Sequence, residues 1–353
     1  MNSKTLIITS GSSQLITQLS VLKKKRIDFC DVYLMYTGLY SDSLDVFFNQ
    51  MSKKYGFEYV GQIQFDVYPI PLSKKEFIYY FFTNKFNRLF NQVENKFPLL
   101  KKYINFNLVL IPVRVKVFED MVLLSYLKPK DIIFTADGVI DVLPKRDLKG
   151  WQYYYLKNTI TRFPLLDEIY SPYFLKVDIK KIGVYTEIDI DEVLLETNKI
   201  ELFIKFKKLY LEDSISYVII SQHYHLHEGI ELEKDISYYK QIIEFALQNC
   251  DNSKVLYKPH PRDVKEKIEN LQLIADNRLI VVNDDYKSLP IELFGKQLKE
   301  MHVIFLTGNS SAPLYFNNSN KIISVCSQSY LHEALNNRIK EFAKNYKIEY
   351  VNL

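Results

Sequence analysis

Residues 303–313 read Val-Ile-Phe-Leu-Thr-Gly-Asn-Ser-Ser-Ala-Pro, an apolar run that ends at Thr-Gly and continues into small hydroxyl residues. A short apolar run of this length is typical of a buried strand, and the glycine marks a turn. Serines followed by Ala-Pro are typical of the start of a helix. The stretch therefore predicts a strand, a turn and a helix, which is the unit from which α/β sheets are built.

Similar units recur outward from this stretch. Short runs rich in Val, Ile, Leu and Tyr alternate with longer segments that have helical periodicity. The predicted strands are 5–9, 32–36, 59–63, 108–113, 132–135, 217–221, 255–257, 279–282, 303–306 and 322–325. The predicted helices are about 13–25, 42–54, 75–96, 115–127, 190–209, 237–249, 263–275, 289–299, 311–317 and 329–344. This alternation predicts an α/β fold with mostly parallel sheets.

The length of 353 residues predicts two domains, because a single hydrophobic core stops growing below this size. Pro164, Pro172 and weak periodicity make the region around them the best linker candidate. We expect a first domain at 1–170, a linker at 171–189 and a second domain at 190–328. The remainder, 329–353, is expected to be a helical segment that packs back on the N-terminal domain.

Composition excludes several classes of protein. The 46 basic and 42 acidic residues are too balanced to predict nucleic-acid binding by charge alone. Three distant cysteines, Cys30, Cys250 and Cys326, fit neither a disulfide framework nor paired zinc spacing. No signal-peptide core and no apolar run of about 18 to 20 residues is present. We therefore expect a cytoplasmic protein with at most peripheral contact with the inner face of a membrane.

Ligands of open α/β sheets bind beyond the carboxyl ends of strands, so polar residues at those ends are the site candidates. The predicted strand 132–135 ends at Ala136-Asp137-Gly138. A carboxylate at this place can be partly desolvated and so act as a general base. The alternative is that Asp-Gly only forms a turn.

A second candidate is Lys258-Pro259-His260-Pro261-Arg262 at the end of the predicted strand 255–257. The two prolines fix the backbone around His260, and a cation lies two positions away on either side. A histidine between two cations suits a phosphate, to which it donates a hydrogen bond or a proton. A structural histidine would not need proline on both sides.

Two further strand ends carry polar residues. The stretch 219–228 ends in Gln222-His223-Tyr224-His225-Leu226-His227-Glu228. Its alternating histidines would converge on zinc only if the segment were extended, and we favour a polar loop that lines a cleft. The serines of 303–313 suit a phosphate or serve only as a helix cap. The stretch lacks the full phosphate-loop pattern of ATP-binding proteins.

Together these segments resemble the motif set of bacterial sialyltransferases of the GT-B type, which include lipooligosaccharide and capsule sialyltransferases and polysialyltransferases. Asp137-Gly138 is similar to their acidic-Gly motif, His260-Pro261 to their His-Pro motif and Ser310-Ser311 to their Ser-Ser/Thr pair, in the same order along the chain. The resemblance implies the GT-B fold, in which two Rossmann-like domains face each other across a cleft.

The resemblance also implies roles for single residues. Asp137 would be the general base, and His260 would hydrogen-bond the departing CMP phosphate. The implied donor-binding residues are Lys258, Pro261, Glu292, Asn309, Ser310, Ser311 and Gln222. The implied acceptor-side residues are Ser12, Ser13 and Gln14. The implied reaction is inverting transfer of sialic acid from CMP-Neu5Ac to a terminal galactose or sialic acid, with no metal and no cofactor.

One departure concerns the base, because Ala136 stands where many members have a second acid. In part of the lipooligosaccharide group, an Asp upstream of the His-Pro motif takes this role, and Asp235 is the candidate here. Asp137 is preferred because it ends an apolar strand, whereas Asp235 sits in a charged stretch. Two alternatives stay open: transfer of Kdo or another ulosonic acid from CMP, and a non-catalytic glycan- or nucleotide-binding protein. The expected partners are a CMP-sugar and a glycan, with a homodimer left open.

Overall fold

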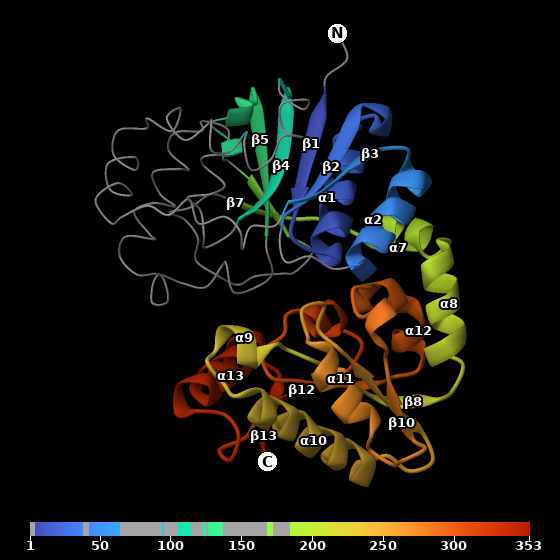
Figure 1. Cartoon of the computed structure of the whole chain (residues 1–353), viewed down its shortest axis with the longest axis vertical. Helices are drawn as coiled ribbons and strands as arrows, with labels where there is room; N and C mark the ends of the chain where they lie inside the picture. The colour runs from blue at the N-terminus through green and yellow to red at the C-terminus, as the bar shows by residue number, and fades with distance from the viewer. Residues whose placement is uncertain are drawn as a thin grey trace. The chain divides into compact units, whose positions relative to one another are not determined.

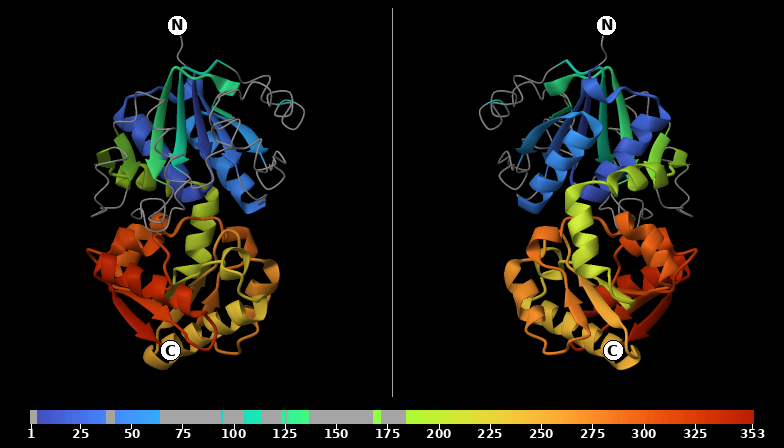
Figure 2. Two further views of the ribbon diagram at one scale, coloured as in Figure 1. Left: turned by 90° about the vertical axis from the view of Figure 1, so that its left-hand side faces the viewer. Right: turned by 90° about the vertical axis from the view of Figure 1, so that its right-hand side faces the viewer.

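The structure is a computed structural model that describes residues 4–37, 42–63, 94, 105–113, 123–124, 126–136, 168–171 and 184–353. The chain divides into two compact units. Unit 1 comprises Met1–Tyr40 and Met51–Val193, and unit 2 comprises Ser41–Gln50 and Leu194–Leu353. Among the described residues, each unit contains one parallel sheet (Figures 1 and 2).

In the described part of unit 1, the sheet has seven strands in the order β3-β2-β1-β4-β5-β6-β7. Its strands are β1 Thr5–Thr9, β2 Val32–Thr37, β3 Glu58–Ile63, β4 Leu108–Val113, β5 Asp131–Ala136, β6 Glu168–Ser171 and β7 Val184–Glu187. Its helices include α1 Ser12–Lys24, η1 Phe29–Asp31 and part of α2 Asp42–Tyr55, while α7 Asp191–Thr197 begins here. Leu6, Ile7 and Ile8 of β1 are fully buried, as expected for a central strand covered on both faces.

The sheet of unit 2 has six strands in the order β10-β9-β8-β11-β12-β13. Its strands are β8 Ile215–Ile220, β9 Lys254–Lys258, β10 Leu279–Val281, β11 Ile304–Thr307, β12 Ile322–Cys326 and β13 Glu349–Asn352. Its helices are α8 Glu201–Tyr210, α9 Tyr224–His227, α10 Leu232–Asn249, α11 Lys265–Gln272, η6 Asp284–Tyr286, η7 Ile291–Phe294, α12 Gly295–Glu300, η8 Ala312–Phe316 and α13 Glu333–Tyr346.

Both sheets follow the Rossmann strand order. The first strand is central, the second and third are added on one side of it, and the later strands are added on its other side. In unit 2 this change of side places β11 beside β8, and every pairing between the strands of this sheet is parallel. The predicted class, α/β with two Rossmann-like domains, is thereby confirmed. Their facing across a cleft stays a prediction.

Helix α10 packs against the second sheet through one apolar face. Its apolar side chains recur at helical spacing, and Ile236, Tyr239 and Ile243 are buried. The helix packs against β8, β9 and α11. Burying each such side chain contributes roughly 1.5–3 kcal/mol, so the polar residues on the same helix are held at fixed depth.

The domain boundaries differ from the expected ones. The predicted linker 171–189 contains β7, which pairs with β6 in the first sheet. The segment 329–353 belongs to unit 2, because β13 pairs with β12 and so completes the second sheet. Short polar strands such as Glu-Tyr-Val-Asn at an edge lack the apolar run that marks a strand in sequence.

Three predicted helices differ from the structure or lie mostly outside the described residues. The predicted helices 75–96 and 115–127 lie mostly outside the described residues. The predicted helix 190–209 is two helices, α7 and α8. Within the described ranges, no helix combines the length and apolar character that crossing a membrane requires.

Candidate functional site

The candidate site lies at the carboxyl end of the second sheet. Ser221 to His223 follow β8, Pro259 to Asp263 follow β9, and Gly308 to Ser311 follow β11. Because β8 is flanked by β9 and β11, these three loops are neighbours. The strand order reverses between β8 and β11, which is where sheets of this type bind ligands.

Side-chain contacts join these loops. The ring of His223, after β8, stacks on the ring of His260, after β9, with centroids 3.9 Å apart. Tyr224 donates a hydrogen bond of 2.9 Å from its hydroxyl to Oδ1 of Asn309, after β11. The β8 loop therefore contacts both of its neighbours, and the predicted His-Pro and Asn-Ser-Ser segments belong to one site region.

The geometry of His260 makes it a hydrogen-bond donor. Its Nδ1 accepts a hydrogen bond of 3.1 Å from the backbone N–H of Arg262. Burial lowers the pKa of His260 well below its usual value, and the neighbouring His223, Arg262 and Lys258 lower it further. A neutral imidazole whose Nδ1 accepts must carry its proton on Nε2. His260 can therefore present Nε2–H to an anionic oxygen.

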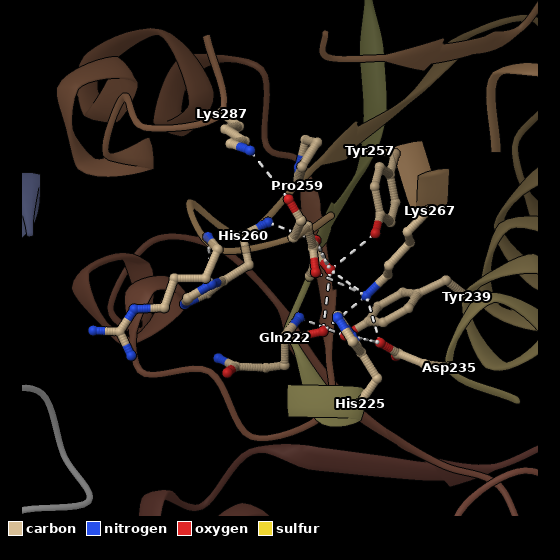
Figure 3. Close-up of polar contacts among 12 residues, drawn as sticks. Gln222, His225, Asp235, Tyr239, Tyr257, Pro259, His260, Lys267 and Lys287 are labelled. Atoms are coloured by element: carbon tan, nitrogen blue, oxygen red, sulfur yellow. Dashed lines mark hydrogen bonds and ion pairs between the residues drawn. The ribbon is translucent and has the colours of Figure 1, made fainter. Parts of the chain in front are cut away.

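A buried ion cluster lies beside His260 (Figure 3) and is formed by Asp235, Asp263 and Lys267. Lys267 Nζ lies 3.1 Å from Asp235 Oδ2 and 3.0 Å from Asp263 Oδ1, and all three residues are at most 1% exposed. Asp263 Oδ2 accepts hydrogen bonds from the backbone N–H of His260 at 2.8 Å and from Ser221 Oγ at 2.6 Å. The cluster thus reaches the His-Pro loop directly.

Sequence reasoning assigned no role to Asp263 or Lys267. Their spacing of four residues, with the lysine on an otherwise polar helix start, was the available signal, since such a pair lies on one helix face. The signal is weak, because most pairs at this spacing are exposed. Lys265 and Glu269, on the same helix, form such an exposed pair.

Asp235, the alternative base, is buried although it sits in a charged stretch of sequence. It lies in the first turn of α10, is fully buried and shares Oδ2 between Lys267 and His225 Nδ1, which is 3.0 Å away. The helix turns Asp235 inward while Glu233 and Lys234 stay exposed. Charge density along a sequence does not report which helix face a residue occupies.

Lys258 is engaged by the backbone. It is 4% exposed, and its ammonium donates hydrogen bonds to the carbonyls of Pro259 at 3.1 Å and Lys287 at 2.5 Å. Burial lowers the pKa of Lys258 to about 7, partly opposed by Asp263 and Glu292. Lys287 in turn donates to the carbonyl of Asp263 at 3.1 Å. These contacts tie the His-Pro loop to the segment after β10.

The loop after β11 is shaped by a close approach. A Cβ on Gly308 would lie 1.8 Å from the Tyr224 hydroxyl, so any other residue at this position would displace that hydroxyl. Ser310 is buried, accepts a hydrogen bond from the backbone N–H of Ala312 at 3.4 Å and leads into η8. Ser311 is half-buried and directly precedes that helix. The N-cap of η8 is Ser311, whose side chain makes no capping hydrogen bond, and phosphate binding by the two serines stays a prediction.

The remaining donor-side candidates are Gln222, Pro261 and Glu292. Gln222 donates its backbone N–H to the Tyr239 hydroxyl and accepts from Lys267 Nζ at 2.9 Å, while its side chain is half-buried and points away from the cluster (Figure 3). Pro261 is half-buried in the His-Pro loop. Glu292 is 3% exposed in η7. Their contact with a donor stays a prediction.

In unit 1, the acceptor-side candidates begin α1 directly after β1. Gln14 Oε1 accepts hydrogen bonds from Ser10 N at 2.7 Å and Ser10 Oγ at 2.9 Å, which fixes the turn. Ser12 is buried and Ser13 is half-buried in the first turn of the helix. Asp137, the preferred base, lies outside the described residues, one position beyond β5.

Two of the alternating histidines, His223 and His225, do not lie on the extended segment that a shared metal would require. His223 precedes α9 and His225 lies within it, so the extended backbone that convergence requires is absent there. Their rings turn to different partners, His260 and Asp235. Among the residues that the structure describes, no group of three His, Cys, Asp or Glu side chains is placed to hold a metal ion.

No family model and no curated protein matches the sequence. Among solved structures, the chain is similar to a UDP-N-acetylglucosamine 2-epimerase at 9% identity and a TM-score of 0.45, covering 98% of this chain and 87% of the other. It is also similar to a sialyltransferase from Photobacterium damsela at 10% identity and a TM-score of 0.48, covering 99% and 81%.

A UDP-glucosyltransferase from Polygonum tinctorium gives 11% identity and a TM-score of 0.48, covering 99% of this chain and 85% of the other. Because the three identities do not exceed 11% and the TM-scores stay below 0.5, these likenesses assign no activity to this chain.

Proposed function

We propose that the chain is a glycosyltransferase that moves sialic acid from CMP-sialic acid to a hydroxyl of a terminal galactose or of another sialic acid on a surface glycan. The observation that carries the proposal is the His260 ring at the switch point of a Rossmann sheet, with its Nδ1 held by the backbone N–H of Arg262, which directs its proton to Nε2. The order of the Asp-Gly, His-Pro and Ser-Ser segments supports the choice of a CMP-sugar.

The proposed reaction is a direct displacement. The oxygen of the acceptor hydroxyl attacks the anomeric carbon of the sialyl unit, the bond from that carbon to the CMP phosphate oxygen breaks, and the configuration inverts. The hydroxyl proton passes to a carboxylate, for which Asp137 is the proposed base and Asp235 the alternative. Both electrons of the broken bond leave with CMP, whose phosphate gains negative charge.

His260 would stabilise this charge. A neutral donor held in place by the Arg262 amide and by Asp263 needs little reorganisation as the phosphate leaves. Hydroxyls of Ser310 and Ser311, and the buried Glu292 toward the ribose, would complete the CMP site. These groups supply the stabilisation without a metal, so the proposed transfer needs none.

The test is product analysis with purified protein, CMP-sialic acid and a galactose-terminated lactoside, with EDTA present and CMP-Kdo in a parallel reaction. We expect sialylated lactoside in the presence of EDTA. Product from CMP-Kdo alone would reassign the sugar, and loss of all transfer on adding EDTA would overturn metal independence. Absence of CMP binding would refute the proposed role of the His-Pro loop.

A variant pair tests His260 itself. His260→Ala should lower kcat by about 10²-fold or more, because phosphate stabilisation matters most in the transition state. His302→Ala, at an exposed histidine outside the site, is the matched control and should leave kcat within twofold. Full turnover in His260→Ala would remove this residue from the mechanism.

A further inference from the structure

Lys267 lies where three segments of unit 2 meet. Its ammonium contacts Ser221 Oγ at 3.1 Å and Gln222 O at 2.9 Å after β8. It also contacts Asp263 Oδ1 at 3.0 Å in the His-Pro loop and Asp235 Oδ2 at 3.1 Å on α10. One cation therefore joins two strand ends and a helix.

The surroundings of Lys267 exclude water. The residue is fully buried, and its Nζ lies 4.1 Å from the centroid of the Tyr239 ring (Figure 3). A buried ammonium is tolerated only where opposite charges and hydrogen-bond acceptors surround it, and removing one partner leaves an uncompensated charge. The contacts of Lys267 thus resist displacement, and the segments that they join are held in one arrangement.

Two routes lead from Lys267 to His260. Along the first, Asp263 accepts from Lys267 with Oδ1 and from the backbone N–H of His260 with Oδ2 at 2.8 Å. Along the second, Lys267 holds the carbonyl of Gln222, whose neighbour His223 stacks on the His260 ring. Lys267 therefore fixes the loops that carry both stacked rings.

We infer that Lys267 is a positioning residue, which sets the place of the His260 ring by holding the loops after β8 and β9 together. The inference rests on the proposed function for its kinetic consequence, but the ring geometry can be measured without any substrate. Lys267 does not touch the leaving phosphate in this assignment; it acts through Asp263 and through the β8 loop.

The experiment compares Lys267→Met with Lys265→Met. Methionine is close to lysine in length and removes the charge, and Lys265 is an exposed lysine two residues earlier on the same helix. The readouts are the NMR signals of the His260 ring, identified with His260→Asn, and kcat and KM for CMP-sialic acid. We expect Lys267→Met to shift the His260 signals, through loss of the ring stack, and to lower kcat at least tenfold. Lys265→Met should change neither.

A second variant separates position from charge. The native cluster has two carboxylates and one ammonium, hence one net negative charge. Lys267→Met leaves two net negative charges in the cluster. Lys267→Met combined with Asp235→Asn leaves only the charge of Asp263 and so restores the native net charge of the cluster. We expect the double variant to recover thermal stability but to keep the shifted His260 signals, because Lys267 no longer holds the loops. The ring signals decide here, because replacing Asp235, the alternative base, would itself lower kcat in that assignment.

The outcomes are distinct. Native His260 signals and kcat within twofold of the native value in either folded variant would overturn the positioning role. Recovery of kcat in the double variant would also overturn it, by assigning the loss to charge alone. If the native protein transferred no sugar from any CMP donor, the proposed function would fail, while the His260 signals would still decide whether Lys267 positions the ring.

Discussion

Replacing Gly308 by alanine should disturb the contact between the loops after β8 and β11. The new Cβ would lie 1.8 Å from the Tyr224 hydroxyl and 3.0 Å from the ring carbon that carries it. Forcing such an overlap typically costs about 1–3 kcal/mol. Displacing the hydroxyl also breaks its hydrogen bond to Asn309, worth about 1 kcal/mol. We therefore expect Gly308→Ala to destabilise unit 2 by about 2–4 kcal/mol.

Tyr224→Phe tests the cause of this loss. With the hydroxyl absent, the nearest remaining atoms would lie 3.0 Å and 3.3 Å from the new Cβ, a strain that shifts of a few tenths of an ångström relieve. When Tyr224→Phe is already in place, the alanine should then cost only about 1 kcal/mol. The two substitutions should therefore couple by about 1–3 kcal/mol.

Urea denaturation, followed by hydrogen exchange in peptides of unit 2, measures the four free energies of this cycle. Gly11→Ala is the control, because its added Cβ meets nothing within 4 Å and its φ of −176° suits any residue. Because the shifted loop carries Asn309 and Ser310, CMP should also bind roughly tenfold more weakly to Gly308→Ala. Additive effects within about 0.5 kcal/mol would refute the clash as the cause.

Three further predictions concern single groups. Because burial lowers the pKa of Lys258 to about 7 from 10.5, the unfolded chain holds this proton more tightly than the folded one. Stability should thus rise by up to ~1.4 kcal/mol per pH unit between these values, and Lys258→Met should flatten that slope in urea curves; parallel slopes would contradict it. A hydrogen bond from Cys30 to Asp28 raises the pKa of the thiol, so Asp28→Asn should speed alkylation of Cys30 by iodoacetamide, and an unchanged rate would exclude this cause. Asp137→Asn should lower sialyl transfer at least ~10²-fold with unchanged CMP affinity, whereas transfer at the native rate would reassign the base.

Strong apolar runs made most of the fold predictable. The ten strands expected from sequence all overlap strands of the structure, because buried parallel strands are continuous apolar segments. The missed strands β6, β7 and β13 are four residues each and contain polar or charged side chains. β7 and β13 lie at sheet edges and β6 lies between β5 and β7. Pairing with a neighbouring strand determines such short strands, and pairing partners are not visible in a local sequence pattern.

The sequence predicted the loops of the candidate site but not the buried ion cluster that contacts them. His260 stood out because prolines flank it, and Ser310 because it follows a strand and a glycine. The ion cluster depends on which face of α10 and α11 meets the sheet, so the sequence predicted neither the burial of Asp235 nor the contacts of Lys267. Charged residues are usually exposed, and whether one is buried instead depends on tertiary packing, which a local sequence pattern does not show.

The tyrosines around the cluster give unit 2 a sensitivity to alkali. Burial raises the pKa values of Tyr224, Tyr238, Tyr239 and Tyr257 well above 10. In the unfolded chain these phenols ionise near pH 10, so the stability that they contribute is complete below pH 10 and falls above it. Each tyrosine can lower the free energy of unfolding by up to ~1.4 kcal/mol per pH unit. Because all four are buried in the same unit, they should ionise together when unit 2 unfolds, and the absorbance of tyrosinate should rise in one cooperative step.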